Sequence, residues 1–363
     1  MPAGLELDRD GLDRDMARRQ LGHGRGGRMK IETDSVEIRS GLRHGRTLGS
    51  PIAVLVANRD YANWEERMNP WPVEGEVQPV HLPRPGHADL PGVLKYDHDD
   101  IRNVLERASA RETAARVAAG ALARQFLAAL GVGIYSHITR IGSVTAPSPD
   151  SLTPADFEAV DESPVRCLDP EAEAAMVEEI NRLRKENESL GGTFEVRAFG
   201  LVPGLGSHVS WQERLDGRIG QAMLSIQSIK GVSIGPAWDV AASRGSEAHD
   251  EIFHDAERGY YRESNRAGGL EGGMTNGEPL LVQVAIKPIS TLTKPLRSVD
   301  IHSKEPRQAH KERTDSTVVP AAGVVGEAML ALMLAQAYRE KFGGDHIDDV
   351  RASVAAYRER IER

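Results

Sequence analysis

Apolar residues recur at helical spacing over a long stretch between Asp99 and Gly131. Asp is a common residue type at the start of a helix and Gly at its end. Most of the apolar positions lie three, four or seven residues from another, which is the repeat of one helix face. We therefore predict one alanine-rich helix over residues 99–131, whose small side chains let neighbouring elements pack closely. The apolar positions are Ile101, Val104, Leu105, Ala108, Ala115, Val117, Ala118, Leu122, Phe126, Leu127 and Leu130.

A second helix is predicted over residues 322–342, where almost every position is apolar and two glycines follow. A helix that is apolar all round is buried. Run 52–56 is apolar throughout and predicts a buried strand. The remaining patterns predict helices over residues 8–20, 171–188 and 215–226, and strands over residues 35–41, 131–138, 193–202, 227–235 and 279–286.

Composition narrows the class of protein. The chain has 363 residues, 40% of them hydrophobic, which is enough for a large core. A net charge of −9 argues against a general nucleic-acid binder, and 5% aromatic residues argue against a single-strand stacking surface. Cys167 is the single cysteine, which excludes an internal disulfide and a cysteine metal cluster. With no run of 18 apolar residues and no signal peptide, we expect a cytoplasmic protein without a membrane contact.

Segment 18–30 concentrates positive charge in this acidic chain. It holds five Arg or Lys residues, four glycines and no acid. Glycine lets the backbone approach a ligand, and arginine offers forked donors to phosphate or carboxylate. The segment therefore predicts an anion site. The alternatives are a flexible basic loop or an RNA contact.

Segments 84–92 and 107–113 add a second group of cations. The first contains two prolines and two glycines, which predict a loop, and it places Arg84 three residues before His87. The second adds two arginines and two hydroxyls within the predicted helix. Together they predict a rigid anion pocket beside a titratable group. A polar loop followed by a surface helix turn is the alternative.

Segment 265–277 contains five glycines, which suggests backbone lying against a flat or charged ligand. Neither a P-loop, a dinucleotide-binding motif, a nucleophile elbow nor a zinc-protease motif is present. The histidines do not occur at metal-ligand spacing, so we expect no metal site. The arginines in glycine-rich segments, together with the nearby histidine, fit a site for a small, multiply anionic substrate that is clamped by arginines.

These segments, in this order along nearly the whole chain, resemble the chorismate synthase family. The matching motifs are long and specific. They are residues 18–30, Ser40-Gly41-Leu42-Arg43-His44-Gly45-Arg46-Thr47-Leu48-Gly49-Ser50-Pro51, residues 84–92, residues 107–113, Gly272-Gly273-Met274-Thr275-Asn276-Gly277, residues 287–291 and Arg313-Thr314-Asp315.

The resemblance implies a lyase of aromatic amino-acid biosynthesis. In this reaction 5-enolpyruvylshikimate 3-phosphate loses phosphate and a ring proton by 1,4-elimination and gives chorismate, the last common product of the shikimate pathway. The implied cofactor is reduced FMN, used without net redox change, with NADPH as the indirect reductant. Since the chain shows no added reductase segment, a separate flavin reductase is the implied partner. The implied fold is α+β, with residues 1–363 as a single-domain sandwich of antiparallel sheets with helices, assembled as a homotetramer.

The resemblance also assigns roles by position. His87 would handle protons near the reduced flavin, Asp315 would help the flavin N5 position take the substrate proton, and Ser109 is a third catalytic candidate. The implied substrate residues are Arg19, Arg25, Arg28, Arg84, Arg111 and Arg313. The implied flavin residues are Arg107, Ala108, Ser109, Gln227, Ser228, Gly273, Lys287, Pro288, Ile289, Ser290, Thr291 and Arg313.

The family carries a further strand and a Gly-Glu-Ser-His-Gly segment before the linker that Met1-Pro2-Ala3-Gly4-Leu5 matches. We therefore expect the domain to be truncated at its N-terminus relative to the family, through a late start or a real shortening. The alternative function is a catalytically impaired paralogue that binds flavin or phosphate, or only assembles.

Overall fold

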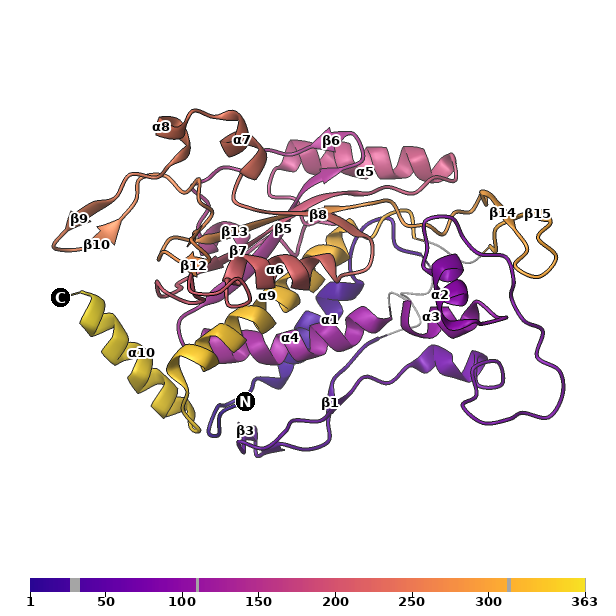
Figure 1. Ribbon diagram of the computed structural model, residues 1–363, viewed down its shortest axis with the longest axis horizontal. Coiled ribbons are helices and arrows are strands. Elements are labelled where there is room, and N and C mark those ends of the chain that lie inside the picture. The colour runs from indigo at the N-terminus through magenta and orange to yellow at the C-terminus, as the bar shows by residue number, and fades with distance from the viewer. Residues whose placement is uncertain (27–32, 109–110, 312–314, 363) are drawn as a thin grey trace.

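The structure is a computed structural model that describes residues 1–26, 33–108, 111–311 and 315–362. Helices and strands are mixed along the chain (Figure 1). The helices are α1 (Arg9–Gln20), α2 (Asp89–Tyr96), α3 (Arg102–Ala108), α4 (Glu112–Ala128), α5 (Pro170–Lys185), α6 (Leu215–Leu224), α7 (Ala237–Ala242), α8 (Gly245–Ala248), α9 (Val319–Phe342) and α10 (Ile347–Ile361), with 3₁₀ turns η2 (Arg59–Asn63) and η3 (Pro154–Phe157). The strands are β1 (Glu37–Ile38), β2 (Leu42–Arg43), β3 (Arg46–Thr47), β4 (Val54–Leu55), β5 (Gly133–Ile141), β6 (Val144–Thr145), β7 (Gly192–Phe199), β8 (Ile229–Ile234), β9 (Phe253–Asp255), β10 (Gly259–Tyr261), β11 (Leu270–Glu271), β12 (Met274–Thr275), β13 (Leu280–Ile286), β14 (Arg297–Val299) and β15 (Pro306–Gln308).

A five-stranded antiparallel sheet lies at the centre, in the order β6-β5-β7-β13-β8. Side chains along β7 alternate between its two faces, as the period of two requires. Phe194, Val196 and Ala198 are fully buried on one face, where α9 packs. Glu195 and Arg197 point to the other face. This alternation fixes the register of the sheet, because a slip of one residue would bury the charges under α9.

Helices α9, α4, α1 and α6 form a layer beneath this sheet (Figure 1). Helix α4 approaches α9 closely because Gly120 has no side chain. A Cβ added there would lie 2.3 Å from the Cβ of Ala328. Among the described helices α9 alone is long and apolar enough to cross a membrane, but 78% of its apolar window is buried inside the protein. Helix α9 is therefore a core helix of the folded protein.

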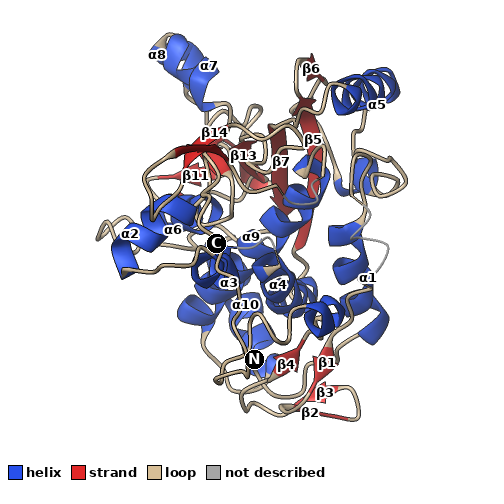
Figure 2. Ribbon diagram, turned by 90° about the vertical axis from the view of Figure 1, so that its right-hand side faces the viewer, coloured by secondary structure: helices blue, strands red, loops and turns tan. Residues whose placement is uncertain are grey.

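One hydrophobic cluster extends from Leu5 to Val354 and includes residues of the sheet and of the helical layer. The start of the chain is tied to the start of α10, because the N–H of Ala3 donates to the carbonyl of Asp345 at 2.7 Å and the N–H of Ile347 donates to the carbonyl of Ala3 at 2.9 Å. Figure 2 shows the short strands β1–β4 at the opposite end of the molecule from α7 and α8.

The α+β class predicted from the sequence is confirmed, but two predicted elements differ. The helix predicted over residues 99–131 is two helices, α3 and α4, and residues 109–110 lie outside the described residues. Run 52–56 forms only the two-residue strand β4, in which Leu55 is 45% exposed. Its partner is β1 in a two-stranded ribbon, and the run is half-buried at Ile52, Val54 and Val56 but exposed at Ala53 and Leu55.

The predicted loop 84–92 is a loop only as far as Ala88, because α2 begins at Asp89 and contains Pro91 and Gly92. A proline in the first turn costs no helical hydrogen bond, since those N–H groups have no intrahelical acceptor. Gly92 has a packing reason: an added Cβ would lie 2.6 Å from the side chain of Val104 on α3.

Candidate active site

Arg19 near the end of α1 and Arg111 at the start of α4 share one carboxylate, that of Asp34. Asp34 accepts hydrogen bonds from Nη2 of Arg19 and from Nη1 of Arg111, the latter at 2.5 Å. The other amino groups reach Oγ1 of Thr113 at 3.4 Å and the carbonyl of Ala57 at 2.8 Å. The structure thus brings together two of the predicted substrate arginines and adds an acid that the motifs did not single out.

Arg25 lies against Asp315, with 3.4 Å between Nη1 and Oδ2. The same carboxylate accepts the backbone N–H of Gly26 at 2.5 Å. A predicted substrate residue and a predicted catalytic residue, 290 positions apart in the sequence, are therefore neighbours. Asp315 also lines a cavity of about 230 Å³, together with Thr291 from the predicted flavin segment.

Arg84 and His87 converge on Asp89. Oδ2 of Asp89 accepts from the backbone N–H of Arg84 at 3.0 Å and from its Nε at 2.9 Å. Nδ1 of His87 lies 2.5 Å from Oδ1 of Asp89. Arg84 also donates to Oγ1 of Thr291 at 3.3 Å, which joins this loop to the predicted flavin segment.

Asp89 is fully buried and remains a carboxylate. Burial alone would raise its pKa, but hydrogen bonds from His87 and Arg84 outweigh burial and hold the pKa well below its usual range. An ionised Asp89 can only accept, so Nδ1 of His87 donates to it. Nε2 is then the ring atom that is left to exchange a proton, and Nη2 of Arg84 lies 3.4 Å from it.

The predicted flavin segment 287–291 packs on the same loop. A Cβ added at Gly86 would lie 3.7 Å from the Cβ of Ser290 and 3.9 Å from Nζ of Lys287. Nζ of Lys287 also reaches the carbonyl of Pro288 at 3.4 Å, and the carbonyl of Ile289 accepts from a serine hydroxyl at 2.9 Å. Burial, aided by the positive charge of a neighbouring lysine, lowers the pKa of Lys287.

Gln227 and Ser228 connect this segment to α4. The carbonyl of Ser228 accepts from the N–H of Lys287 at 3.0 Å, and Nε2 of Gln227 donates to Oε2 of Glu112 at 2.9 Å. Glu112 follows Arg111 directly. Oε1 of Gln227 is buried and has no hydrogen-bond partner within the described residues.

Other predicted residues stand apart from this group. Arg107 is exposed and lies 4.0 Å from Glu106, and Ala108 is the last residue of α3. Gly273 accepts the N–H of Leu215 at the start of α6, whereas Gln227 follows the end of that helix, about 15 Å further at 1.5 Å per residue. Arg28, Ser109 and Arg313 lie outside the described residues.

Two acids of the site, Asp34 and Asp89, were not identified from the sequence. Asp89 lies within the Arg84 loop, two residues after His87, so its proximity could have been noticed. Asp34 lies 15 positions from Arg19 and 77 from Arg111, so only the fold shows that it joins them. Among the described residues, no group of three or more His, Cys, Asp or Glu side chains could hold a metal ion.

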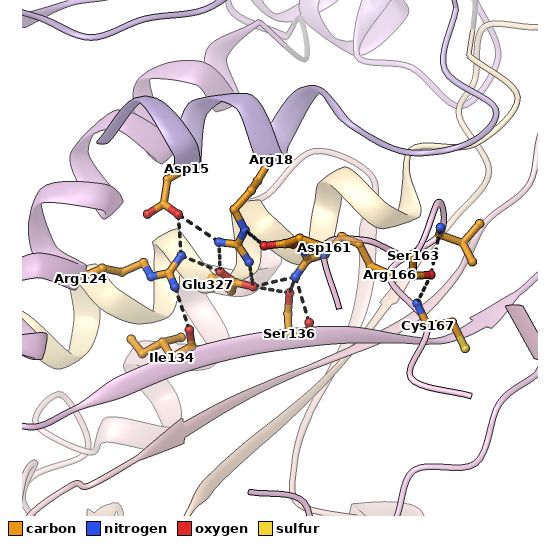
Figure 3. Close-up of polar contacts among 11 residues, drawn as sticks. Asp15, Arg18, Arg124, Ile134, Ser136, Asp161, Ser163, Arg166, Cys167 and Glu327 are labelled. Carbon is orange, nitrogen blue, oxygen red and sulfur yellow. Dashed lines mark hydrogen bonds and ion pairs between the residues drawn. The ribbon is translucent and has the colours of Figure 1, made fainter. Parts of the chain in front are cut away.

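Beside the site, a buried ionic cluster holds α1 against α9 (Figure 3). Its centre is Glu327 on α9, which is fully buried. Oε2 accepts from Arg18 at 2.7 Å and Arg124 at 2.8 Å, and Oε1 accepts from Arg166 at 3.0 Å and Ser136 at 2.6 Å. Arg18 precedes Arg19 on α1, and the two side chains go to different acids: Arg18 binds Glu327 in the cluster, whereas Arg19 binds Asp34 in the site.

Two further acids balance the charge of this cluster (Figure 3). Asp15 accepts from Arg18 at 3.0 Å and from Arg124 at 2.9 Å. Asp161 accepts from Nε of Arg18 at 2.6 Å and pairs with Arg166. Three arginines thus face three carboxylates. A cavity of about 680 Å³ adjoins the cluster between α1, the end of α4, β5 and η3, and none of the predicted site residues lines it.

The charges within the cluster depend on one another. Burial would raise the pKa of Glu327, but the charges of Arg18, Arg124 and Arg166 lower it to about 2. Burial lowers the pKa of Arg166 to about 10 against the attraction of Glu327, and the positive charges of Arg18 and Arg124 add to this effect. Among the described residues, Glu327 is therefore the one acid that pairs with all three arginines.

The sequence pattern of the family described as Chorismate synthase matches residues 1–338. The chain belongs to the chorismate synthase family. It is 55% identical to "Chorismate synthase" of Symbiobacterium thermophilum over 373 residues, which cover 100% of this chain and 95% of that protein. It is 56% identical to "Chorismate synthase" of Rubrobacter xylanophilus, with 99% of this chain and 92% of that protein covered.

A solved structure titled "Crystal Structure of Chorismate Synthase" superposes with a TM-score of 0.79 at 39% sequence identity, over 99% of this chain and 92% of the solved chain. The predicted family, its α+β fold and its lyase activity in aromatic amino-acid biosynthesis are thereby confirmed. The alternative of an impaired paralogue is not favoured, since these full-length relatives are named as the enzyme.

Chorismate synthases use reduced FMN, and the described residues fit such a group. Lys287 offers a partly buried cation for a phosphate, and the buried Oε1 of Gln227 offers an acceptor that lacks a partner among the described residues. Lys287 and Gln227 belong to one connected set, because Ser228, the residue after Gln227, accepts a hydrogen bond from the N–H of Lys287.

Proposed function

We propose that this protein converts 5-enolpyruvylshikimate 3-phosphate into chorismate at the site formed by Arg19, Arg25, Arg84 and Arg111. One observation carries the proposal: each of these four side chains is at most 16% exposed and is held by a carboxylate. A buried guanidinium that is already positioned binds an anion with little reorganisation. The substrate carries a phosphate and two carboxylates, which matches a site of several arginines.

Arg111 and Arg19 are the proposed clamp for one anionic group, because Asp34 ties them together. Arg25 is the proposed clamp for a second group, next to the cavity between Asp315 and Thr291. Arg28 and Arg313 remain predicted members of the clamp. Fixing a small substrate by several charged contacts orients its ring for elimination.

His87 and Asp315 are the proposed groups that handle protons. Asp89 holds the imidazole of His87 so that Nε2 is available for exchange, and an exchange of this kind typically contributes about 10²–10⁴-fold to a rate. Asp315 is held by Arg25 and by the N–H of Gly26, which keeps its carboxylate in one place. Ser109 remains a predicted third participant.

Reduced FMN, when bound, supplies electron density to the reacting ring without net redox change. Residues 287–291 with Gln227 and Ser228 are the proposed residues that hold it. Arg107, Ala108, Ser109, Gly273 and Arg313 remain predictions. We further propose that NADPH reduces the flavin indirectly through a separate reductase.

A single domain over residues 1–363 is supported by the core cluster that extends from Leu5 to Val354. A cytoplasmic location fits a biosynthetic enzyme whose one long apolar helix is mostly buried. The homotetramer is carried over from the family. Sedimentation of the purified protein would test it directly.

The test of the proposed function is phosphate release under anaerobic conditions. Purified protein is mixed with 5-enolpyruvylshikimate 3-phosphate and FMN that has been reduced chemically, and both phosphate and chorismate are measured. We expect equal amounts of the two products, and no turnover when FMN is omitted. Turnover without flavin, or phosphate without chorismate, would contradict the proposal.

A further inference from the structure

We propose that Asp34 is a positioning residue of the substrate site, whose buried carboxylate sets the spacing of Arg19 and Arg111. Its side chain is 2% exposed, and its two oxygens are divided between the two arginines. This inference rests on the proposed function, since it concerns the same arginines. It adds a residue that does not itself bind the substrate but acts through two residues that do.

Asp34 is held independently of the two arginines. Its backbone N–H donates to Oε1 of Gln20 on α1 at 3.3 Å. Two residues later, the N–H of Val36 donates to Oδ1 of Asp13, also on α1, at 3.3 Å. The main chain that carries the carboxylate is thus attached to α1 by contacts that do not involve Arg19 or Arg111.

The arginines retain capacity for a ligand while Asp34 holds them. Arg19 is 4% exposed, and its Nε has no hydrogen-bond partner within the described residues. A buried donor without an acceptor is costly, so such a donor in a site points to a ligand. Arg111 keeps one amino group on Asp34 and the other on the carbonyl of Ala57, which fixes the plane of its guanidinium.

The charge of Asp34 also reduces the electrostatic repulsion between the guanidinium groups of Arg19 and Arg111. Two guanidiniums that approach the same anion repel each other when the anion is absent. One carboxylate between the two guanidiniums offsets one of their two positive charges, so the three groups together remain positive. Asp34→Asn should therefore keep the shape but let the pair separate, so the clamp would have to be reassembled around each substrate molecule.

Asp15 provides a matched control. It lies on α1, is buried, and bridges two arginines, Arg18 at 3.0 Å and Arg124 at 2.9 Å, as Asp34 does. None of these three residues belongs to the proposed substrate set. Asp15→Asn should therefore lower the melting temperature without changing substrate affinity.

The experiment measures binding of 5-enolpyruvylshikimate 3-phosphate by calorimetry to the full chain loaded with oxidised FMN, at two ionic strengths. For Asp34→Asn we expect Kd to rise about tenfold or more, the range for a hydrogen bond to a charged group. FMN affinity without substrate should be unchanged. The salt dependence of Kd should become steeper, because the pair carries one more net positive charge. Asp34→Glu should recover part of the affinity.

An unchanged Kd in Asp34→Asn, a tighter Kd, or an equal loss in Asp15→Asn would overturn the inference. Because the experiment measures binding and not turnover, it tests the inference about Asp34 separately from the proposed function. Wild-type protein that binds the substrate without forming chorismate contradicts the function, while the effect of Asp34 on Kd is still measured. Wild-type protein that binds no substrate overturns both.

Discussion

Replacing Glu327 by Gln removes one charge from the centre of the cluster and keeps the volume of the side chain. Three arginines would then share a neutral amide, and Arg18 would keep at most one of the two acceptor oxygens that it now binds at 2.7 and 2.9 Å. Breaking a buried ion pair by removing one partner costs about 3–5 kcal/mol. The lowered pKa of Glu327, about 2 against its ordinary 4.5, gives a similar estimate of roughly 3 kcal/mol at 1.36 kcal/mol per pKa unit.

At an unfolding entropy of roughly 2.1 cal/mol/K per residue, this loss lowers Tm by about 4–7 °C for a chain of 363 residues. Differential scanning calorimetry of wild type and Glu327→Gln measures it. Glu340→Gln on the same helix is the control, because Glu340 is half exposed and pairs with Arg218 at 2.7 Å. An exposed pair contributes about 0–1 kcal/mol, so the control should shift Tm by about 1 °C or less. Equal shifts in both variants would show that the buried charge of Glu327 stabilises the fold no more than an exposed charge does.

The same variant predicts a pH dependence. Because the pKa of Glu327 in the folded protein lies below 4.5, its stabilising contribution is present above pH 4.5 and is lost as the pH falls toward about 2. Glu327→Gln lacks this group. The difference in Tm between wild type and variant should therefore be constant between about pH 6 and 8 and shrink below about pH 4.5. A difference that grows on acidification would contradict the assignment.

Four further variants test the site and the core. His87→Ala should lower kcat by roughly 10²-fold with the fold intact, and steady-state phosphate release measures it; an unchanged kcat would make the imidazole structural. Arg25→Ala and Arg111→Ala should each weaken substrate binding by about 2–3 kcal/mol while FMN binding without substrate survives, and calorimetry compares the two ligands. Equal loss of both ligands would mean that these arginines hold the flavin or the fold. Gly120→Ala should cost about 1–3 kcal/mol in thermal unfolding, since the new Cβ would meet Ala328 at 2.3 Å; a variant as stable as wild type would mean that α4 and α9 can separate at no cost.

Patterns that repeat locally were enough to predict the helical layer. Helix α9 was predicted as buried because its sequence is apolar on every side, and the structure places it on the sheet. The same periodicity missed the break between α3 and α4, because both helices continue one apolar pattern. Helix α2 was missed because Pro91 and Gly92 are poor helix formers in general, although a proline in the first turn is tolerated.

The sequence predicted which residue types form the candidate site, but it did not predict the ion-pair partners of those residues. Glycine-rich basic segments indicate an anion site, and Arg25 and Arg84 lie in such segments. Which acid holds which arginine depends on contacts between distant parts of the chain. Asp315 meets Arg25 across 290 positions, and no local pattern encodes that contact.

The proposed function requires that arginines already held by carboxylates form the substrate clamp. A crystal structure with bound 5-enolpyruvylshikimate 3-phosphate and oxidised FMN tests it most directly. We predict that Arg19, Arg25, Arg84 and Arg111 each donate to a phosphate or carboxylate oxygen of the substrate at about 2.7–3.1 Å, while Asp34 keeps its contacts to Arg19 and Arg111. Substrate bound instead in the larger cavity between α1 and β5, with these four arginines still occupied only by protein groups, would show that they are not the substrate clamp.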